Sequence, residues 1–299
     1  MKANDLYKEV TDSIIEMLES GTRPWMKPWQ DGQASNLPLR VNSVPYRGVN
    51  ILLLWAAACA KGYQNAHWMT YKAAAEMGAQ VRKGEKSTHV VVTSTFNKQD
   101  SEDPDKKNTI PFYKVYSVFN ADQIDGLPEK YYLSATPKEM IPVSDRVQEA
   151  INFFANTKAV VVEHPSRACY IPSKDQIQMP PLEAFVTPES YVATHAHELV
   201  HWTKHKSRLD REYGAVVWGD EGYAKEELVA ELGSAFLCAY LQVTPEVQPE
   251  HASYIESWLK ALKGDTKYIF KAASAAQKAT EYLQAFSAPV QAEDEQEAA

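Results

Sequence analysis

The pentapeptide His197-Glu198-Leu199-Val200-His201 constrains this chain more than any other segment. In an α-helix, residues four apart lie on one face, one turn above the other, so both imidazoles can reach a single metal ion. The surrounding residues 190–205 have the apolar spacing of a helix. The sequence therefore predicts a helix that presents His197 and His201 as metal ligands, with Glu198 beside them as the catalytic carboxylate.

A metal site of this kind needs a third protein ligand and leaves a fourth position for water. The helical pattern at 224–241 contains Glu227 and Glu231, four residues apart on one helix face. We assign Glu227 as the third ligand and Glu231 as the carboxylate that accepts an N–H from a metal-bound histidine. The exchange of these two roles is the alternative. Glu226 points about 100° away from Glu227 in an ideal helix, so we expect an exposed charge there.

The predicted metal is Zn²⁺ or another divalent ion such as Mn²⁺, because imidazole and carboxylate ligands suit these ions. The ion would lower the pKa of water, and Glu198 would take the proton so that hydroxide attacks a carbonyl. A strand pair, the helix with both histidines and a later helix with the glutamate are the gluzincin arrangement. We expect the strand-like segment 168–179 to lie beside an extended peptide through edge pairing.

The charge of the chain is unevenly distributed. The net charge is −8, but residues 1–130 are nearly balanced, and the stretch 21–98 holds ten basic residues against three acidic ones. Aromatic side chains interleave with these cations, as in proteins that bind single-stranded nucleic acid through phosphate contacts and base stacking. The predicted DNA-binding residues are Trp25, Lys27, Trp29, Arg40, Tyr46, Arg47, Trp68, Tyr71, Lys72, Arg82, Lys83 and Lys86.

Hydrophobic periodicity predicts an α+β fold in two domains. The first domain, 1–135, is expected to be α+β, and the second, 136–290, mainly helical with a small sheet. An acidic tail follows at 291–299. The expected helices are 5–20, 49–61, 70–77, 144–157, 190–205, 224–241, 251–263 and 267–286, and the expected strands are 88–96, 112–119, 159–163 and 168–179.

No stretch of the sequence approaches the roughly 20 apolar residues that cross a bilayer. The first nine residues, Met1 to Glu9, contain no apolar core of the kind that a secretory signal needs. We therefore expect a cytoplasmic protein without a membrane partner.

Several motifs in a fixed order resemble the plasmid antirestriction proteins of the ArdC type, over about residues 5–286. They are Tyr46-Arg47-Gly48-Val49-Asn50, Trp68-Met69-Thr70-Tyr71, Val81-Arg82-Lys83-Gly84-Glu85-Lys86, His197 to Trp202 and Glu226 to Leu237. The resemblance implies an N-terminal single-stranded-DNA-binding domain, shared with TraC-type plasmid primases, and a C-terminal zincin-like metallopeptidase domain. It also implies a role in conjugation, where plasmid DNA enters as a single strand and must escape restriction.

Three functions are compatible with these parts. In the first, DNA binding concentrates a metallopeptidase near a protein target such as a restriction enzyme. In the second, the protein protects DNA by occupying it, and the metal site is structural or regulatory. In the third, the peptidase removes proteins attached to DNA.

Overall fold

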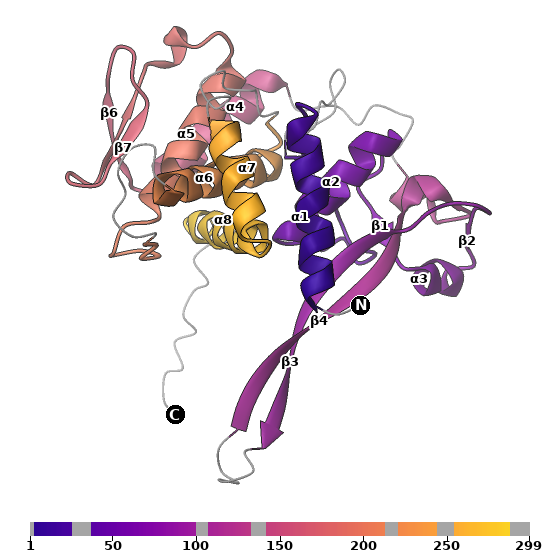
Figure 1. Ribbon diagram of the computed structural model, residues 1–299. Coiled ribbons are helices and arrows are strands. Elements are labelled where there is room, and N and C mark those ends of the chain that lie inside the picture. Colours follow the sequence, from indigo (N-terminus) through magenta and orange to yellow (C-terminus); the bar gives the residue numbers. More distant parts are fainter. Residues whose placement is uncertain are drawn as a thin grey trace, which may run out of the picture.

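The computed structural model describes residues 3–25, 37–99, 107–132, 142–212, 221–243 and 254–287. It has a mixed α and β architecture, which confirms the predicted fold class (Figure 1). The first half contains α1 (Ala3–Glu19), α2 (Val49–Lys61), β1 (Trp68–Met69), α3 (Tyr71–Glu76), β2 (Gln80–Val81), β3 (Thr88–Gln99), β4 (Lys107–Asn120), η1 (Ala121–Gln123), β5 (Ile124–Asp125) and η2 (Glu129–Tyr131). The second half contains α4 (Val143–Asn156), β6 (Val160–Glu163), β7 (Cys169–Ile171), β8 (Gln176–Met179), η3 (Leu182–Ala184), α5 (Pro188–Trp202), α6 (Glu221–Tyr240), α7 (Ile255–Gly264) and α8 (Tyr268–Gln284).

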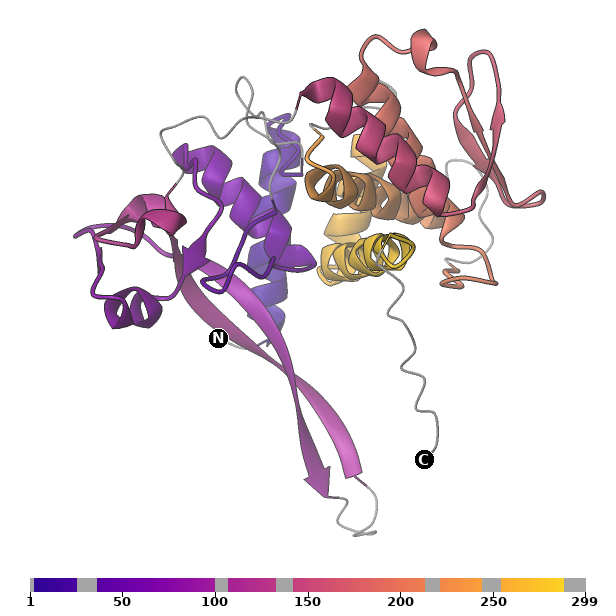
Figure 2. The same ribbon diagram turned by 180° about the vertical axis from the view of Figure 1, so that it is seen from behind.

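In the first half, β3 and β4 form a long antiparallel ribbon that extends away from the helices (Figure 2). Their pairing runs from Thr88 opposite Val118 to Gln99 opposite Lys107, so both strands are longer than the sequence predicted. They extend beyond the expected bounds, 88–96 and 112–119, because an antiparallel ladder joins backbone groups and can continue without apolar side chains. β1 pairs with the other edge of β4.

The second half places a small sheet beside a helical group. The strand order is β6-β8-β7, with β6 and β8 parallel and β7 antiparallel at one edge. The segment expected as one strand-like run at 168–179 is divided by a turn in which Asp175 has φ 48°. Helix α5 begins where the Thr187 hydroxyl accepts a hydrogen bond from the Ser190 amide at 3.1 Å, with Pro188 at the first helical position.

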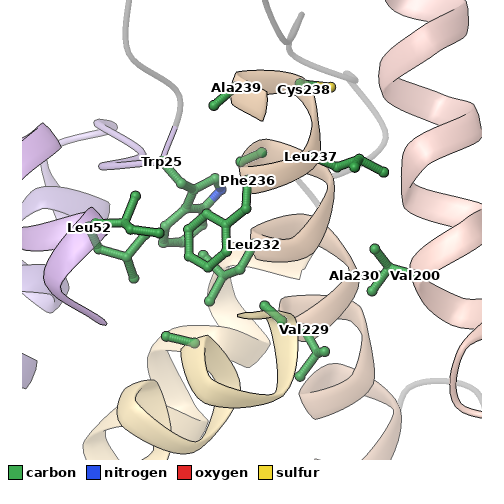
Figure 3. Packing of buried hydrophobic residues seen from close by; sticks show 14 of the residues in the cluster. Trp25, Leu52, Val200, Val229, Ala230, Leu232, Phe236, Leu237, Cys238 and Ala239 are labelled. Carbon is green, nitrogen blue, oxygen red and sulfur yellow. The ribbon is translucent and has the colours of Figure 1, made fainter. Parts of the chain in front are cut away.

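One hydrophobic core joins the two halves. In Figure 3 the Trp25 ring lies between Leu52 of α2 and Phe236 of α6. Trp55 of α2 meets the Phe236 ring edge-on at a centroid distance of 6.0 Å. Helix α1 also packs on α7, and α2 on α8. The core is therefore completed only when both halves are present.

The predicted domain boundary at 135/136 and the predicted acidic tail at 291–299 both lie outside the described residues. The division at 135 stays a prediction, whereas the described core is continuous across it. Within the part of the chain that the structure describes, no helix has the length and hydropathy that a bilayer-spanning helix needs.

Candidate metal centre

His197 and His201 lie one turn apart near the end of α5, and Glu227 faces them from α6. The two Nε2 atoms are 3.1 Å apart. The Glu227 carboxylate oxygens lie 3.5 Å from His197 Nε2 and 3.4 Å from His201 Nε2. Ligand atoms around a tetrahedral ion with bonds of about 2.0–2.1 Å are about 3.3 Å apart. The three side chains, all buried, therefore fit a single divalent metal ion.

A close approach of α5 and α6 brings Glu227 near the two histidines. A Cβ added at Gly233 would lie 2.7 Å from Val200 Cγ2 and 2.9 Å from Val200 Cγ1. Val200 is fully buried and β-branched, so its side chain has little freedom to move away. Glycine at position 233 thus allows the helix with Glu227 to pack directly against the helix with the two histidines.

Glu226 occupies a place that the sequence analysis did not expect. It is 2 % exposed, and its Oε1 atom lies 3.2 Å from His201 Nδ1. The Arg211 guanidinium donates to the same oxygen at 2.9 Å. The expectation of an exposed charge at Glu226 is wrong, because α6 is buried on several faces by α5, α7 and α8. A carboxylate in this position fixes the tautomer of His201 and orients its Nε2 atom toward a metal.

Glu231 lies on the other side of the histidine pair. Its Oε2 atom is 3.9 Å from His197 Nδ1, whereas its Oε1 atom accepts a hydrogen bond from the Trp25 indole at 3.2 Å. Glu227 contacts both Nε2 atoms, and Glu231 faces an Nδ1 atom. This geometry favours Glu227 over Glu231 as the third ligand.

Charge balance also fits a divalent ion. Four carboxylates gather here, those of Glu198, Glu226, Glu227 and Glu231, and each of these residues is less than 9 % exposed. Arg211 pairs with Glu226, and Arg23 lies 3.5 Å from Glu231. Among the described residues, no arginine lies within ion-pair distance of the Glu198 or Glu227 carboxylate, and a divalent cation would offset the cost of burying them.

The ionisable groups respond to this negative environment. Burial disfavours the charged form of His201, but the carboxylates of Glu227 and Glu226 outweigh that effect and raise its pKa to about 10. Burial likewise disfavours a charged Glu227, yet His201 and His197 hold the pKa of its carboxyl well below the usual range. Glu227 is thus ionised, and a bound metal ion would take the place of the proton on the neighbouring His201.

The Glu198 side chain extends from α5 toward the edge strand β7. Its Oε2 atom accepts a hydrogen bond from the Tyr170 backbone N–H at 2.6 Å. The Tyr170 hydroxyl in turn donates to Asp175 at 2.9 Å, and Asp175 pairs with Arg208, whose guanidinium lies over Trp202 at 3.9 Å. Burial, followed by Asp175, raises the pKa of Tyr170 above its ordinary value. This network holds β7 against the end of α5.

Three of the predicted DNA-stacking residues are buried. Trp25 and Trp68 are each 1 % exposed, and Tyr46 is 8 % exposed. Burial raises the pKa of Tyr46 to about 12, although Arg40 opposes this effect. The prediction that these rings stack on bases is wrong, because all three pack in the hydrophobic core. Lys27 and Trp29 lie outside the described residues.

The other predicted DNA-binding side chains are exposed, and the three arginines among them contact other side chains of the protein. Arg40 lies over the Tyr46 ring at 5.4 Å, and Arg47 forms an ion pair with Glu281 of α8. Arg82 pairs with Glu85 at 3.0 Å and Asp125 at 3.3 Å.

A second group lies at the end of the molecule formed by α3 and β2 (Figure 1). There, the Gln80 side chain donates to the Tyr71 hydroxyl at 3.1 Å and so ties α3 to β2. Four of the predicted DNA-binding residues, Tyr71, Lys72, Lys83 and Lys86, are exposed at this end, and we call them the α3–β2 surface.

Sequence reasoning missed Glu226, Arg211, Arg23 and Trp25 as neighbours of the site. A signal for Glu226 was available, because the two Nδ1 atoms of a metal-binding histidine pair point away from the metal and need acceptors from other directions. Trp25 and Glu231 are 206 residues apart. No spacing rule connects positions so distant.

Two family models match the chain. Residues 4–119 match the N-terminal domain of the anti-restriction factor ArdC, and residues 148–275 match a zincin-like metallopeptidase. The first match ends within β4 and the second covers α5 and α6. The metal-ligand candidates thus lie in the metallopeptidase match, and the α3–β2 surface lies in the ArdC match.

Curated proteins from two organisms are also similar. The uncharacterized protein y4eC of Sinorhizobium fredii is 40 % identical over 94 % of this chain and 92 % of its own length. Two DNA primases TraC of Escherichia coli are 37 % and 38 % identical, but the chain spans only 20 % and 27 % of their lengths.

Two crystal structures of the antirestriction ArdC protein from plasmid R388 resemble this chain along almost its whole length. The metal-free structure is 46 % identical with a TM-score of 0.81, covering 95 % of this chain and 98 % of that one. The Mn(II)-bound structure is 45 % identical with a TM-score of 0.79, covering 96 % and 99 %. With both family models in the same order and this identity over nearly the whole length, the chain belongs to the ArdC family of antirestriction proteins.

Proposed function

We propose that this protein binds single-stranded DNA, protects incoming conjugative plasmid DNA from restriction, and hydrolyses a protein target at its metal centre. The observation that carries the catalytic part is the ligand set His197, His201 and Glu227, whose donor atoms lie 3.1 to 3.5 Å apart. The Mn(II)-bound state of the R388 relative supports a divalent ion, either Zn²⁺ or Mn²⁺.

The chain supplies positioned groups around that ion. When bound, a divalent ion supplies Lewis acidity that polarises a carbonyl and lowers the pKa of water. Glu198 would accept a proton at the oxygen that does not bind the Tyr170 amide. The edge of β7 that pairs with no described strand carries the Tyr170 N–H bonded to Glu198, so a peptide lying along that edge would pass the carboxylate.

Glu198→Gln tests the peptidase function. Glutamine keeps an oxygen for the Tyr170 N–H, so the fold and metal binding should persist, but it cannot take a proton. Transfer of unmodified plasmid DNA into a restricting recipient should then lose its protection, and cleavage of a protein target should fall by about 10²-fold or more. Glu183→Gln, an exposed change on η3, is the matched control.

Protection that survives Glu198→Gln would instead support the second candidate, a protein that protects by occupying DNA, with a structural or regulatory metal site. One observation favours it: an oxygen of Glu198 is already engaged by the Tyr170 amide at 2.6 Å. A protease for DNA-attached proteins uses the same parts. It would be recognised if Glu198→Gln abolished cleavage of protein–DNA adducts while leaving protection intact.

The α3–β2 surface is the part of the described chain that we assign to DNA. Lys83 and Lys86 flank Gly84, which has φ 92° and open space around its Cβ position, so backbone can approach a phosphate closely. Tyr71 is 52 % exposed and offers a ring on which a base can stack. The surface thus combines cations with an aromatic face.

Replacement of Lys83 and Lys86 by alanine should weaken single-strand binding and make it less sensitive to salt. Each lost phosphate contact reduces the slope of log affinity against log salt concentration by about 0.7, so the double variant should lose about 1.4. Fluorescence anisotropy with a labelled oligonucleotide at several salt concentrations measures this slope. Lys174→Ala with Lys260→Ala, two exposed lysines in the second half, is the control. An equal loss in both pairs would contradict the assignment.

A further inference from the structure

The segment that follows α1 reaches from the first half of the chain to the metal centre in the second. The Trp25 indole Nε1 donates to Glu231 Oε1 at 3.2 Å, and an Arg23 guanidinium nitrogen lies 3.5 Å from the same oxygen. Both contacts are shielded from water, since Trp25 is 1 % exposed and the side chains of Arg23 and Glu231 are 9 % and 6 % exposed.

Packing fixes the Trp25 ring in one place. It meets Trp258 of α7 edge-on at a centroid distance of 5.8 Å, and it lies between Leu52 and Phe236 in Figure 3. The indole N–H therefore has a defined direction, toward α6. A buried donor with so little freedom holds its acceptor in place more strictly than a mobile surface side chain could.

These contacts also fix the position of the other carboxylate oxygen of Glu231. Trp25 and Arg23 both contact the Oε1 atom of Glu231. The Oε2 atom of Glu231 therefore faces His197 Nδ1, at 3.9 Å. His197 Nε2 is the atom that faces Glu227 and His201. At 3.9 Å, Oε2 is too far from Nδ1 for a hydrogen bond, but its negative charge favours the tautomer with the proton on Nδ1, which leaves Nε2 for the metal.

We propose that Trp25 and Arg23 are positioning residues of the metal centre, acting on His197 through Glu231. This inference rests on the proposed metal site and extends it beyond the metallopeptidase-like segment 148–275 to a part of the chain that matches the ArdC N-terminal domain. By linkage, metal binding and the docking of residues 21–25 onto α6 stabilise each other. The centre is assembled from both halves of the chain.

The test measures Mn²⁺ affinity of the full chain by isothermal titration calorimetry. Trp25→Phe keeps an aromatic ring in the core but removes the N–H donor, and we expect roughly tenfold weaker binding, in the range found for groups that support metal ligands. Arg23→Gln should weaken binding in the same direction and serves as a second variant if Trp25→Phe does not fold. Trp68→Phe is the matched control, because Trp68 is equally buried, at 1 % exposure, in β1.

A double-mutant cycle with Glu231→Gln separates positioning from general loosening of the core. If Trp25 acts through Glu231, Trp25→Phe should weaken Mn²⁺ binding by less than about twofold in the Glu231→Gln background. Equal affinities for Trp25→Phe and Trp68→Phe, or full additivity with Glu231→Gln, would overturn the proposal while leaving the metal centre intact. Failure of the wild-type chain to bind Mn²⁺ would overturn the metal centre itself, and this inference with it.

Discussion

Glu227→Ala should weaken divalent metal binding by roughly a hundredfold or more. Zinc sites with four protein ligands bind with about 10–16 kcal/mol, so one ligand contributes roughly 3 kcal/mol, or about a hundredfold in affinity. Glu227 is the carboxylate within 3.5 Å of both histidine Nε2 atoms. Titration with Mn²⁺ and with Zn²⁺ in a competing chelator measures the loss.

The same titration decides between the two possible third ligands. If Glu227 is the ligand and Glu231 the supporting carboxylate, Glu231→Ala should weaken binding by less, about 10- to 100-fold. The reverse order would show that their roles are exchanged. Glu256→Ala, an exposed change on α7, should leave the affinity unaltered.

Trp55→Ala should destabilise the whole protein, and not only its first half, by about 3–5 kcal/mol. Trp55 is 4 % exposed and meets Phe236 of α6 across the join between the halves. Since the core is continuous, we expect a single unfolding transition whose midpoint falls by roughly 5–15 °C. Differential scanning calorimetry with and without Mn²⁺ measures it.

Val160→Ala provides the control for that experiment, because Val160 is 58 % exposed on β6 and its truncation should change stability by no more than about 0.5 kcal/mol. Added metal should raise the one transition as a whole. Two separate transitions, with only the upper or the lower one responding to Mn²⁺, would show that the halves unfold independently and would contradict the shared core.

The helices and the positions of residues on their faces are predictable from sequence, because both depend on residue spacing within one segment. Apolar periodicity located the helices, and the spacing of His197 and His201 placed both on one face of α5. Glu227 was found in the same way, from its place in a second helical pattern. The geometry of such a helix pair depends on short-range spacing, so the candidate ligands could be named from the sequence.

The features that sequence reasoning missed depend on contacts between distant segments. Trp25 looked like a stacking platform because it lies among cations, but burial against Trp258 decides its role. Glu226 looked exposed because a single helix face was considered, whereas α6 is enclosed on several sides. Tertiary packing overrides composition in both cases, and neither partner could be identified from spacing along the chain.

The contact between α1 and the segment just before α8 also affects when the protein can finish folding. The Thr11 hydroxyl of α1 donates to the Thr266 carbonyl at 2.6 Å, across a separation of 255 residues. A ribosome adds about 5–20 residues per second, so the first helix waits roughly 13–50 s before its acceptor has been synthesised. During that interval the apolar faces of α1 and α2 lack their partners on α7 and α8. The nascent first half therefore exposes apolar surface that the complete chain buries, and such surface favours aggregation.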